Sequence, residues 1–210
     1  MNNFTYEEKD RKEQCEKYEW DNLWIDHADE PLLNRVLYIG DSISCRAGRA
    51  ATSLAKEKIL FDGFGTSKGI DNPYFKEAIR LFAKEEQRRD VVLFNNGLHG
   101  WHLEDDTQYR YYYEEMIKFL LREFENIPVA VVLTTITANK DRNNRIVIRN
   151  RVARDVAYKY GLPIIDLYTP TSEATELLSN DGVHFEPEGD KLIANKIILS
   201  ILTFFPGIEL

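Results

Sequence analysis

Three side chains from the two ends of this chain could together perform acyl transfer through a serine. Ser42 lies in the text Gly-Asp-Ser-Ile-Ser directly after an apolar run at 36–39, where a strand would turn into a helix. Asp181 and His184 stand three residues apart near the other end. A serine hydroxyl is a poor nucleophile until a base removes its proton, and a histidine oriented by a carboxylate can act as that base. The sequence therefore predicts Ser42 as nucleophile, His184 as base and Asp181 as the orienting group.

The elements that must position these residues alternate along the chain. Short apolar runs typical of strands buried on both faces lie at 36–39, 59–61, 91–94, 129–133 and 164–167. Helix-like stretches lie at roughly 45–56, 73–88, 107–126, 143–160 and 187–204. This alternation predicts a parallel sheet with right-handed crossovers, in a three-layer α/β/α sandwich whose sheet has five strands.

The candidate residues all follow predicted strands. Ligands of such sheets bind beyond the carboxyl ends of the strands. Ser42 follows the first run, residues 65–69 follow the second, residues 95–102 follow the third, and Asp181 and His184 come after the fifth. We therefore expect these distant segments to converge on one edge of the sheet.

The Gly-Asp-Ser-Ile-Ser segment at 40–44, combined with Asp-Gly-Val-His at 181–184, resembles the SGNH (GDSL) hydrolase family. The resemblance covers roughly residues 35–204. It implies a flavodoxin-like fold and an esterase that works through an acyl-enzyme at Ser42. The standard α/β-hydrolase pattern does not fit, because the segment lacks the second glycine of the G-x-S-x-G elbow.

The same resemblance implies an oxyanion hole with three donors. The first is the backbone N–H of Ser42, and the second is a glycine N–H, for which spacing favours Gly69 over Gly65. The family's third donor is an asparagine, but aligning the glycine of Asn-Asn-Gly-Leu-His at 95–99 places His99 there. A neutral imidazole N–H can replace the amide donor. Two alternatives stay open. Asn96 or Asn95 could supply the third donor from a shifted loop, and His99 could only brace the loop.

Other polar and aromatic residues near these segments are weaker candidates. Asp41, Trp101 and His102 are candidates for substrate binding, although Trp101 could simply cover the sheet edge. Two cations in the segment after the fourth strand, Lys140 and Arg142, are expected to be solvated loop charges. The thiol of Cys45 is expected to be packed in the interior, because no separate base accompanies it.

Composition excludes several classes of function. The chain has 210 residues, a net charge of −8 and a pI near 5.1, which argue against nucleic acid or an anionic membrane as partner. The polar N-terminus lacks a signal core, and two cysteines are too few for a disulfide framework, so a cytoplasmic protein is expected. No metal site or cofactor is expected, because His99 and His102 have no further ligands nearby in the sequence and no phosphate loop is present.

We expect one domain at 35–210, preceded by an arm at 1–34 that is rich in aromatics. The arm's tryptophans are expected to pack on the domain or on a second subunit, which makes a homo-oligomer reasonable; a tryptophan at the site's mouth is the alternative. Short connections predict no large lid, so the favoured substrate is a short acyl ester, such as an acetyl ester on a carbohydrate. The alternatives are a thioesterase or lysophospholipase-like hydrolase and a non-catalytic binding protein.

Overall fold

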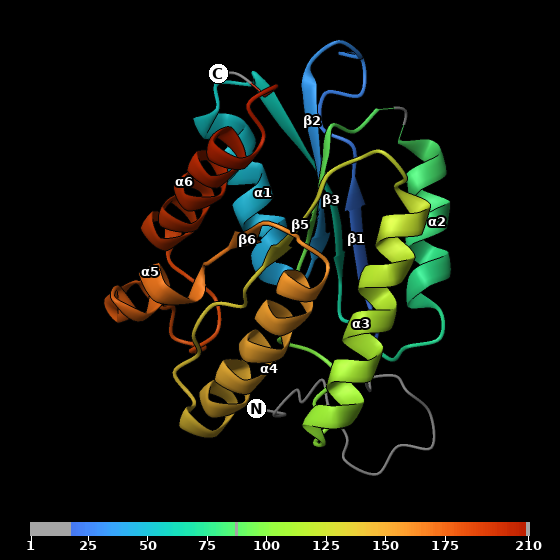
Figure 1. The fold of residues 1–210 in the computed structure, drawn as a ribbon. Coiled ribbons are helices and arrows are strands. Elements are labelled where there is room, and N and C mark those ends of the chain that lie inside the picture. Colours follow the sequence, from blue (N-terminus) through green and yellow to red (C-terminus); the bar gives the residue numbers. More distant parts are fainter. Residues whose placement is uncertain (1–17, 87, 209–210) are drawn as a thin grey trace.

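The computed structural model describes residues 18–86 and 88–208, and its strands form one six-stranded sheet in the order β1-β3-β2-β4-β5-β6 (Figure 1). Residues 1–17 of the predicted arm, with Cys15, lie outside the described residues. The strands are β1 Asp21–Trp24, β2 Asn34–Gly40, β3 Ile59–Thr66, β4 Val91–Phe94, β5 Val129–Val132 and β6 Ile164–Ile165.

The helices follow the strands as the sequence pattern predicts, with one short addition before the last of them. Their bounds are α1 Ser42–Leu54, α2 Phe75–Glu85, α3 Asp106–Glu123, α4 Lys140–Lys159, α5 Tyr168–Ser172 and α6 Pro187–Phe204. A 3₁₀ turn at Thr175–Leu177 lies between α5 and α6. Lys140 and Arg142 begin α4, so they are not in a loop as expected.

The prediction of a five-stranded sheet is wrong by one strand. β1 pairs antiparallel with β3, whereas β2 to β6 are parallel to one another. β1 is an edge strand of four residues in which only every second residue is partly buried. Its sequence therefore contains no apolar run of the kind that predicted the other strands. Without β1, the five predicted strands have the order 2-1-3-4-5 of flavodoxin-like folds, so the fold class itself is confirmed.

Helices cover both faces of the sheet and complete the three layers (Figure 1). On one face, apolar residues of α1 and α6 pack on the sheet, among them Ala47, Ala51, Ile193 and Ile197. On the other face, α2, α3 and α4 supply residues such as Phe75, Met116 and Val156. No helix in the described ranges is long and apolar enough to cross a membrane.

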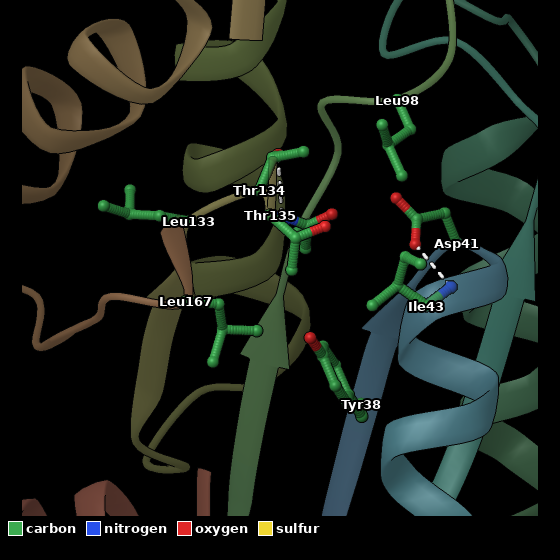
Figure 2. A pocket seen from close by; sticks show the side chains of 9 residues that line it. Tyr38, Asp41, Ile43, Leu98, Leu133, Thr134, Thr135 and Leu167 are labelled. Carbon is green, nitrogen blue, oxygen red and sulfur yellow. Dashed lines mark hydrogen bonds between the residues drawn. The ribbon is translucent and has the colours of Figure 1, made fainter. Parts of the chain in front are cut away.

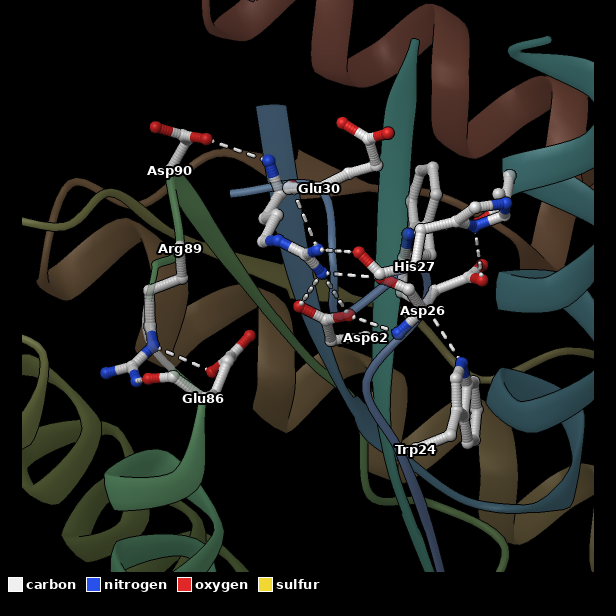
Figure 3. Close-up of polar contacts among 11 residues, drawn as sticks. Trp24, Asp26, His27, Glu30, Asp62, Glu86, Arg89 and Asp90 are labelled. Atoms are coloured by element: carbon white, nitrogen blue, oxygen red, sulfur yellow. Dashed lines mark hydrogen bonds and ion pairs between the residues drawn. The ribbon is translucent and has the colours of Figure 1, made fainter. Parts of the chain in front are cut away.

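A buried ion pair lies at the end of the sheet where β2 begins (Figure 3). The Arg35 guanidinium contacts the Asp62 carboxylate at 2.9 Å, and both side chains are almost fully buried. Arg35 also donates to the carbonyls of Asp26 and His27, while Asp62 accepts from the Asp26 N–H. These bonds fix the segment between β1 and β2 to the sheet. Breaking such a pair on one side leaves an uncompensated buried charge.

Glu86 lies at the end of α2, in the same region of Figure 3, and its carboxyl group is fully buried. Its Oε2 accepts from Arg89 at 2.7 Å, whereas Oε1 has no partner among the described residues. Burial raises the pKa of Glu86 from 4.5 to about 8; Arg89 opposes that rise and the nearby Asp62 carboxylate adds to it. The protonated carboxyl is therefore the form that this fold favours.

Glu86→Gln should flatten the pH dependence of stability. The folded-state pKa is raised, so the stabilising contribution is fully present below about pH 4.5 and is lost as pH rises through about 8. One proton gives a slope of at most about 1.4 kcal/mol per pH unit. The measurement is urea unfolding between about pH 4.5 and 8. It compares the free energy of unfolding of the wild type, of Glu86→Gln and of the exposed control Glu85→Gln. Equal slopes in all three proteins would contradict the assignment.

Candidate active site

Ser42 lies at the first turn of α1, directly beyond the carboxyl end of the central strand β2. The helix begins there because Asp41 caps it: its Oδ1 accepts a hydrogen bond of 2.9 Å from the Ile43 N–H. A side-chain acceptor at this position satisfies one of the unpaired N–H groups of a helix start. The strand end and the cap together fix the backbone on both sides of Ser42.

His184 and Asp181 lie in the tight loop before α6. The Asp181 Oδ1 accepts from the N–H groups of Val183 and His184 at 2.8 and 2.9 Å, and from the Ser179 hydroxyl at 2.8 Å. Phe185 is fully buried next to the histidine and anchors the loop to the core. This loop therefore has little freedom to move the imidazole.

The structure brings the three predicted side chains into one hydrogen-bonded chain. The His184 Nε2 lies 2.7 Å from the Ser42 Oγ, and its Nδ1 lies 2.6 Å from the Asp181 Oδ2. Partial burial disfavours the charged Asp181 carboxylate, but hydrogen bonds from His184, the backbone and Ser179 outweigh it and hold its pKa well below the usual range. Asp181 therefore stays ionised, as a group that orients and stabilises an imidazolium must.

Asp41 points into a small interior cavity instead of into solvent (Figure 2). The cavity has a volume of about 10 Å³, and Tyr38, Leu98 and Thr135 are among its lining residues. The Asp41 Oδ2 and the Thr135 Oγ1 are buried and have no partner among the described residues. Burial raises the pKa of Asp41, and the imidazole of His99, N–H groups of α1 and the imidazole of His184 lower it. Direct substrate contact by Asp41 stays a prediction, although only 3% of the residue is exposed.

The loop after β4 meets the loop after β3 at two glycines. A Cβ on Gly69 would lie 2.9 Å from the Cα of Gly100, and Gly100 has a left-handed backbone with φ of +68°. Only residues without side chains allow this approach and this conformation. The contact places Gly69 beside the loop that carries His99, as the predicted oxyanion hole requires.

The side chains of the alternative oxyanion donors make other hydrogen bonds. The Asn96 amide donates to the Lys68 carbonyl at 2.9 Å, and the Asn95 amide donates to the Val132 carbonyl and the Thr134 hydroxyl. Gly65 lies within β3, where a Cβ would lie only 2.0 Å from the Cys45 sulfur. Gly65 therefore leaves room for that sulfur, and the assignment of Gly69 and His99 as oxyanion donors stays a prediction.

Cys45 is buried one turn after Ser42. Burial raises the pKa of its thiol to about 12, and the Asp41 carboxylate adds to that rise. A thiol with this pKa is not a thiolate near neutral pH, so the packing role expected for Cys45 fits its surroundings.

A cavity of about 250 Å³ opens beside Ser42. Its lining includes Trp20 and three residues that sequence reasoning did not place there: Asn22, Arg46 and Arg49. Trp20 directly precedes β1: its carbonyl accepts from the Ser67 N–H and its N–H donates to the Ser67 hydroxyl. The Trp20 ring meets the His99 ring edge-on, with the ring centroids 6.0 Å apart. The alternative in which a tryptophan lies at the site's mouth therefore describes Trp20, whereas Trp24 packs on β3.

Trp101 and His102 lie apart from this cavity. Trp101 is 7% exposed and is covered by the guanidinium of Arg149 at 4.6 Å. The His102 Nε2 lies 2.7 Å from the Asp71 Oδ2, and both residues line a separate cleft of about 430 Å³ with Tyr111. Contact of Trp101 or His102 with substrate stays a prediction. No group of three or more metal-ligating side chains occurs in the described ranges.

Neither a family model nor a curated relative matches this sequence, but solved structures match its fold. An acetyl esterase variant with bound acetate is 15% identical, with a TM-score of 0.66 over 84% of this chain and 100% of that one. A GDSL-like lipase from Bacteroides thetaiotaomicron is 17% identical, with a TM-score of 0.65 over 81% and 88%. An acetyl xylan esterase is 20% identical, with a TM-score of 0.60 over 80% and 99%. The chain thus has the SGNH (GDSL) hydrolase fold, which confirms the resemblance at that level.

Arg149 of α4 is the residue that holds the loop after β4 in place. Its buried guanidinium donates to three carbonyls of that loop: Gly97 at 3.0 Å, His99 at 2.7 Å and Gly100 at 2.7 Å. Hydrogen bonds from a charged donor are worth more than neutral ones, at about 1.5–3 kcal/mol each. The position of His99 therefore depends on a residue that lies 50 positions later in the sequence.

Arg149→Met should lower the free energy of unfolding by roughly 3 kcal/mol or more, because three buried carbonyls lose their donor. Arg151→Met, an exposed change on the same helix, should stay within about 0.5 kcal/mol of the wild type. Urea denaturation measures both. Equal, small effects would mean that the loop is held by other contacts.

Proposed function

We propose that this protein is a serine esterase of the SGNH type that hydrolyses a small acyl ester, with acetyl esters of carbohydrates as the favoured class. One observation carries the proposal: the continuous hydrogen-bonded chain from Ser42 through His184 to Asp181, with contacts of 2.7 and 2.6 Å. A serine, a base within hydrogen-bond reach and a group that orients the base are the requirements for a covalent acyl intermediate.

In the proposed reaction the Ser42 Oγ attacks the ester carbonyl while the His184 Nε2 takes the hydroxyl proton. The imidazolium then gives this proton to the leaving alcohol oxygen, and an acyl-enzyme remains. Water attacks that ester with His184 again as base, which releases the acid and restores the serine. Asp181 keeps the His184 Nδ1–H pointed at its carboxylate throughout.

The negative charge on the carbonyl oxygen needs donors in this proposal. We assign the N–H groups of Ser42 and Gly69 and a ring N–H of His99 to this task. Support comes from the contact of Gly69 with the loop of His99, and from Asp41, whose pKa both His99 and His184 lower. Two imidazoles that act on one buried carboxylate lie near the same helix start.

The lining beside Ser42 favours a short and polar substrate. Asn22, Arg46 and Arg49 line a cavity of only about 250 Å³, whereas a thioesterase or lysophospholipase needs an apolar channel for its acyl chain. The acetyl esterases with the same fold agree with this choice. A long-chain hydrolase remains the alternative, and a series of esters of increasing acyl chain length distinguishes the two.

Ser42→Ala should abolish hydrolysis of 4-nitrophenyl acetate without loss of the fold, because it removes the nucleophile from a partly exposed helix start. The test compares esters from acetate to decanoate for the wild type and the variant, with circular dichroism as the control for folding. A sulfonyl fluoride should label the wild type at Ser42 only. Full activity in the variant, or no labelling and no turnover in the wild type, would refute the esterase proposal and favour a binding protein.

His99→Ala should lower kcat about 10²–10³-fold, the usual cost of one oxyanion donor, with little change in the melting temperature. Steady-state kinetics together with thermal unfolding separate the two roles considered for this residue. If only the melting temperature changes, His99 braces the loop and another group binds the oxyanion.

A further inference from the structure

The cavity beside Ser42 carries a concentration of positive charge that is unusual for an acidic protein. The whole chain has a net charge of −8, yet Arg46 and Arg49 line this cavity, which contains no carboxylate among its lining residues. Both arginines lie on the face of α1 that begins at Ser42, four and seven residues later. The charge is therefore built into the same helix as the nucleophile.

The two arginines differ in what already neutralises them. Arg46 donates through Nε and Nη2 to the Asp190 Oδ2 at 2.8 and 2.7 Å, so its charge is compensated within the protein. Arg49 makes no ion pair with any residue in the described ranges. Its guanidinium makes a hydrogen bond of 3.3 Å to the Asn22 Oδ1 and stacks on the Trp24 ring at 4.4 Å from the ring centroid.

The stack fixes the position of Arg49, while no carboxylate of residues 18–86 or 88–208 pairs with its charge. The Trp24 ring covers one face of the guanidinium, and the Trp24 Nε1 donates to the Phe61 carbonyl at 2.9 Å, which fixes the ring on the sheet. A guanidinium stacked by its face keeps its edge donors free for a planar, bidentate partner such as a carboxylate. A neutral ester can accept single hydrogen bonds from these donors, but it has no carboxylate for the bidentate, charge-assisted pairing.

Helix geometry gives the approximate reach of the subsite. At 1.5 Å per residue, the Cα atoms of Ser42 and Arg49 lie about 10 Å apart along α1. An arginine side chain spans much of that distance, so the anion would lie a few bonds from the reacting carbonyl. The indole of Trp20 lines the same cavity and offers an apolar surface for the carbon atoms between the two groups.

We propose that Arg49, with Arg46 beside it, binds a carboxylate of the substrate, so that the preferred ester is an acidic one. The inference rests on the proposed esterase function and adds the charge of the substrate to it. The carboxylate could belong to the acyl group, as in a half-ester of a dicarboxylic acid, or to the alcohol, as in an acetylated uronic acid. Both present the same chemistry to Arg49, and paired substrates separate them.

The kinetic test uses two matched pairs of esters. The acyl pair is mono-4-nitrophenyl succinate and 4-nitrophenyl butyrate; the alcohol pair is an acetylated methyl glucuronide and the corresponding glucoside. In either the acyl pair or the alcohol pair, the wild type should have a kcat/KM for the anionic ester that is about 10–100-fold higher than for the neutral one. This is the range expected for one charge-assisted contact. High salt should reduce this preference.

Arg49→Gln should collapse the ratio between the two esters of the preferred pair, and the exposed control Arg151→Gln should leave it unchanged. The proposal is overturned if neither pair shows a preference for the anion. It is also overturned if Arg49→Gln lowers kcat/KM for both esters equally, since the residue would then act only by packing on Trp24.

A binding experiment separates failure of this inference from failure of the esterase proposal. Calorimetry with Ser42→Ala needs no turnover and uses methyl succinate and the acetylated methyl glucuronide as probes. Binding of either probe that is lost in the Ser42→Ala, Arg49→Gln double variant supports the anion subsite even if the wild type hydrolyses nothing. Binding of neither probe, or binding that does not depend on Arg49, refutes the subsite even if Ser42 is a working nucleophile.

Discussion

The parallel pairing of β2 between β3 and β4 is the constraint on which the candidate site depends. Gly40 at the end of β2 pairs with Gly65 of β3, and Ile39 pairs with Phe94 of β4. This register brings the loops after three strands to one edge of the sheet, where a change of strand order leaves a crevice. Ser42, Gly69 and His99 come from those three loops.

Once the strands are paired, side chains from distant helices complete the arrangement. The loop of His184 reaches the serine because Phe185 is buried and because the Ala138 N–H donates to the Gly182 carbonyl at 2.8 Å. Arg149 holds the loop of His99 from the opposite layer. The arrangement of the candidate site therefore depends on hydrogen bonds to backbone carbonyls and carboxylates as much as on Ser42, His184 and Asp181 themselves.

The sequence predicted the layers, the five parallel strands and the meeting of Ser42 with Asp181 and His184, because apolar runs and the order of motifs carry that information. It missed β1, whose four residues contain no apolar run and whose pairing with β3 is set by tertiary contacts. Trp20 at the cavity was only one of two alternatives for the arm's tryptophans, because its position depends on its contact with Ser67 directly after β3, which no local pattern predicts. Arg46 and Arg49 could have been found, since their spacing from Ser42 puts all three on one helix face.

The missed strand has a consequence for the edge of the sheet. All eight residues of β3 are buried, and β1 covers the edge that β3 would otherwise present. The Trp24 ring packs so closely on Gly63 that a Cβ on that glycine would lie 1.9 Å from the ring. The packing of β1 on β3 therefore requires a residue without a side chain at this position. An open sheet edge is a template for strands of other chains. Without the segment up to Trp24, the outer N–H and C=O groups of β3 would lose their partners on β1, and β3 itself would become the open edge of the sheet.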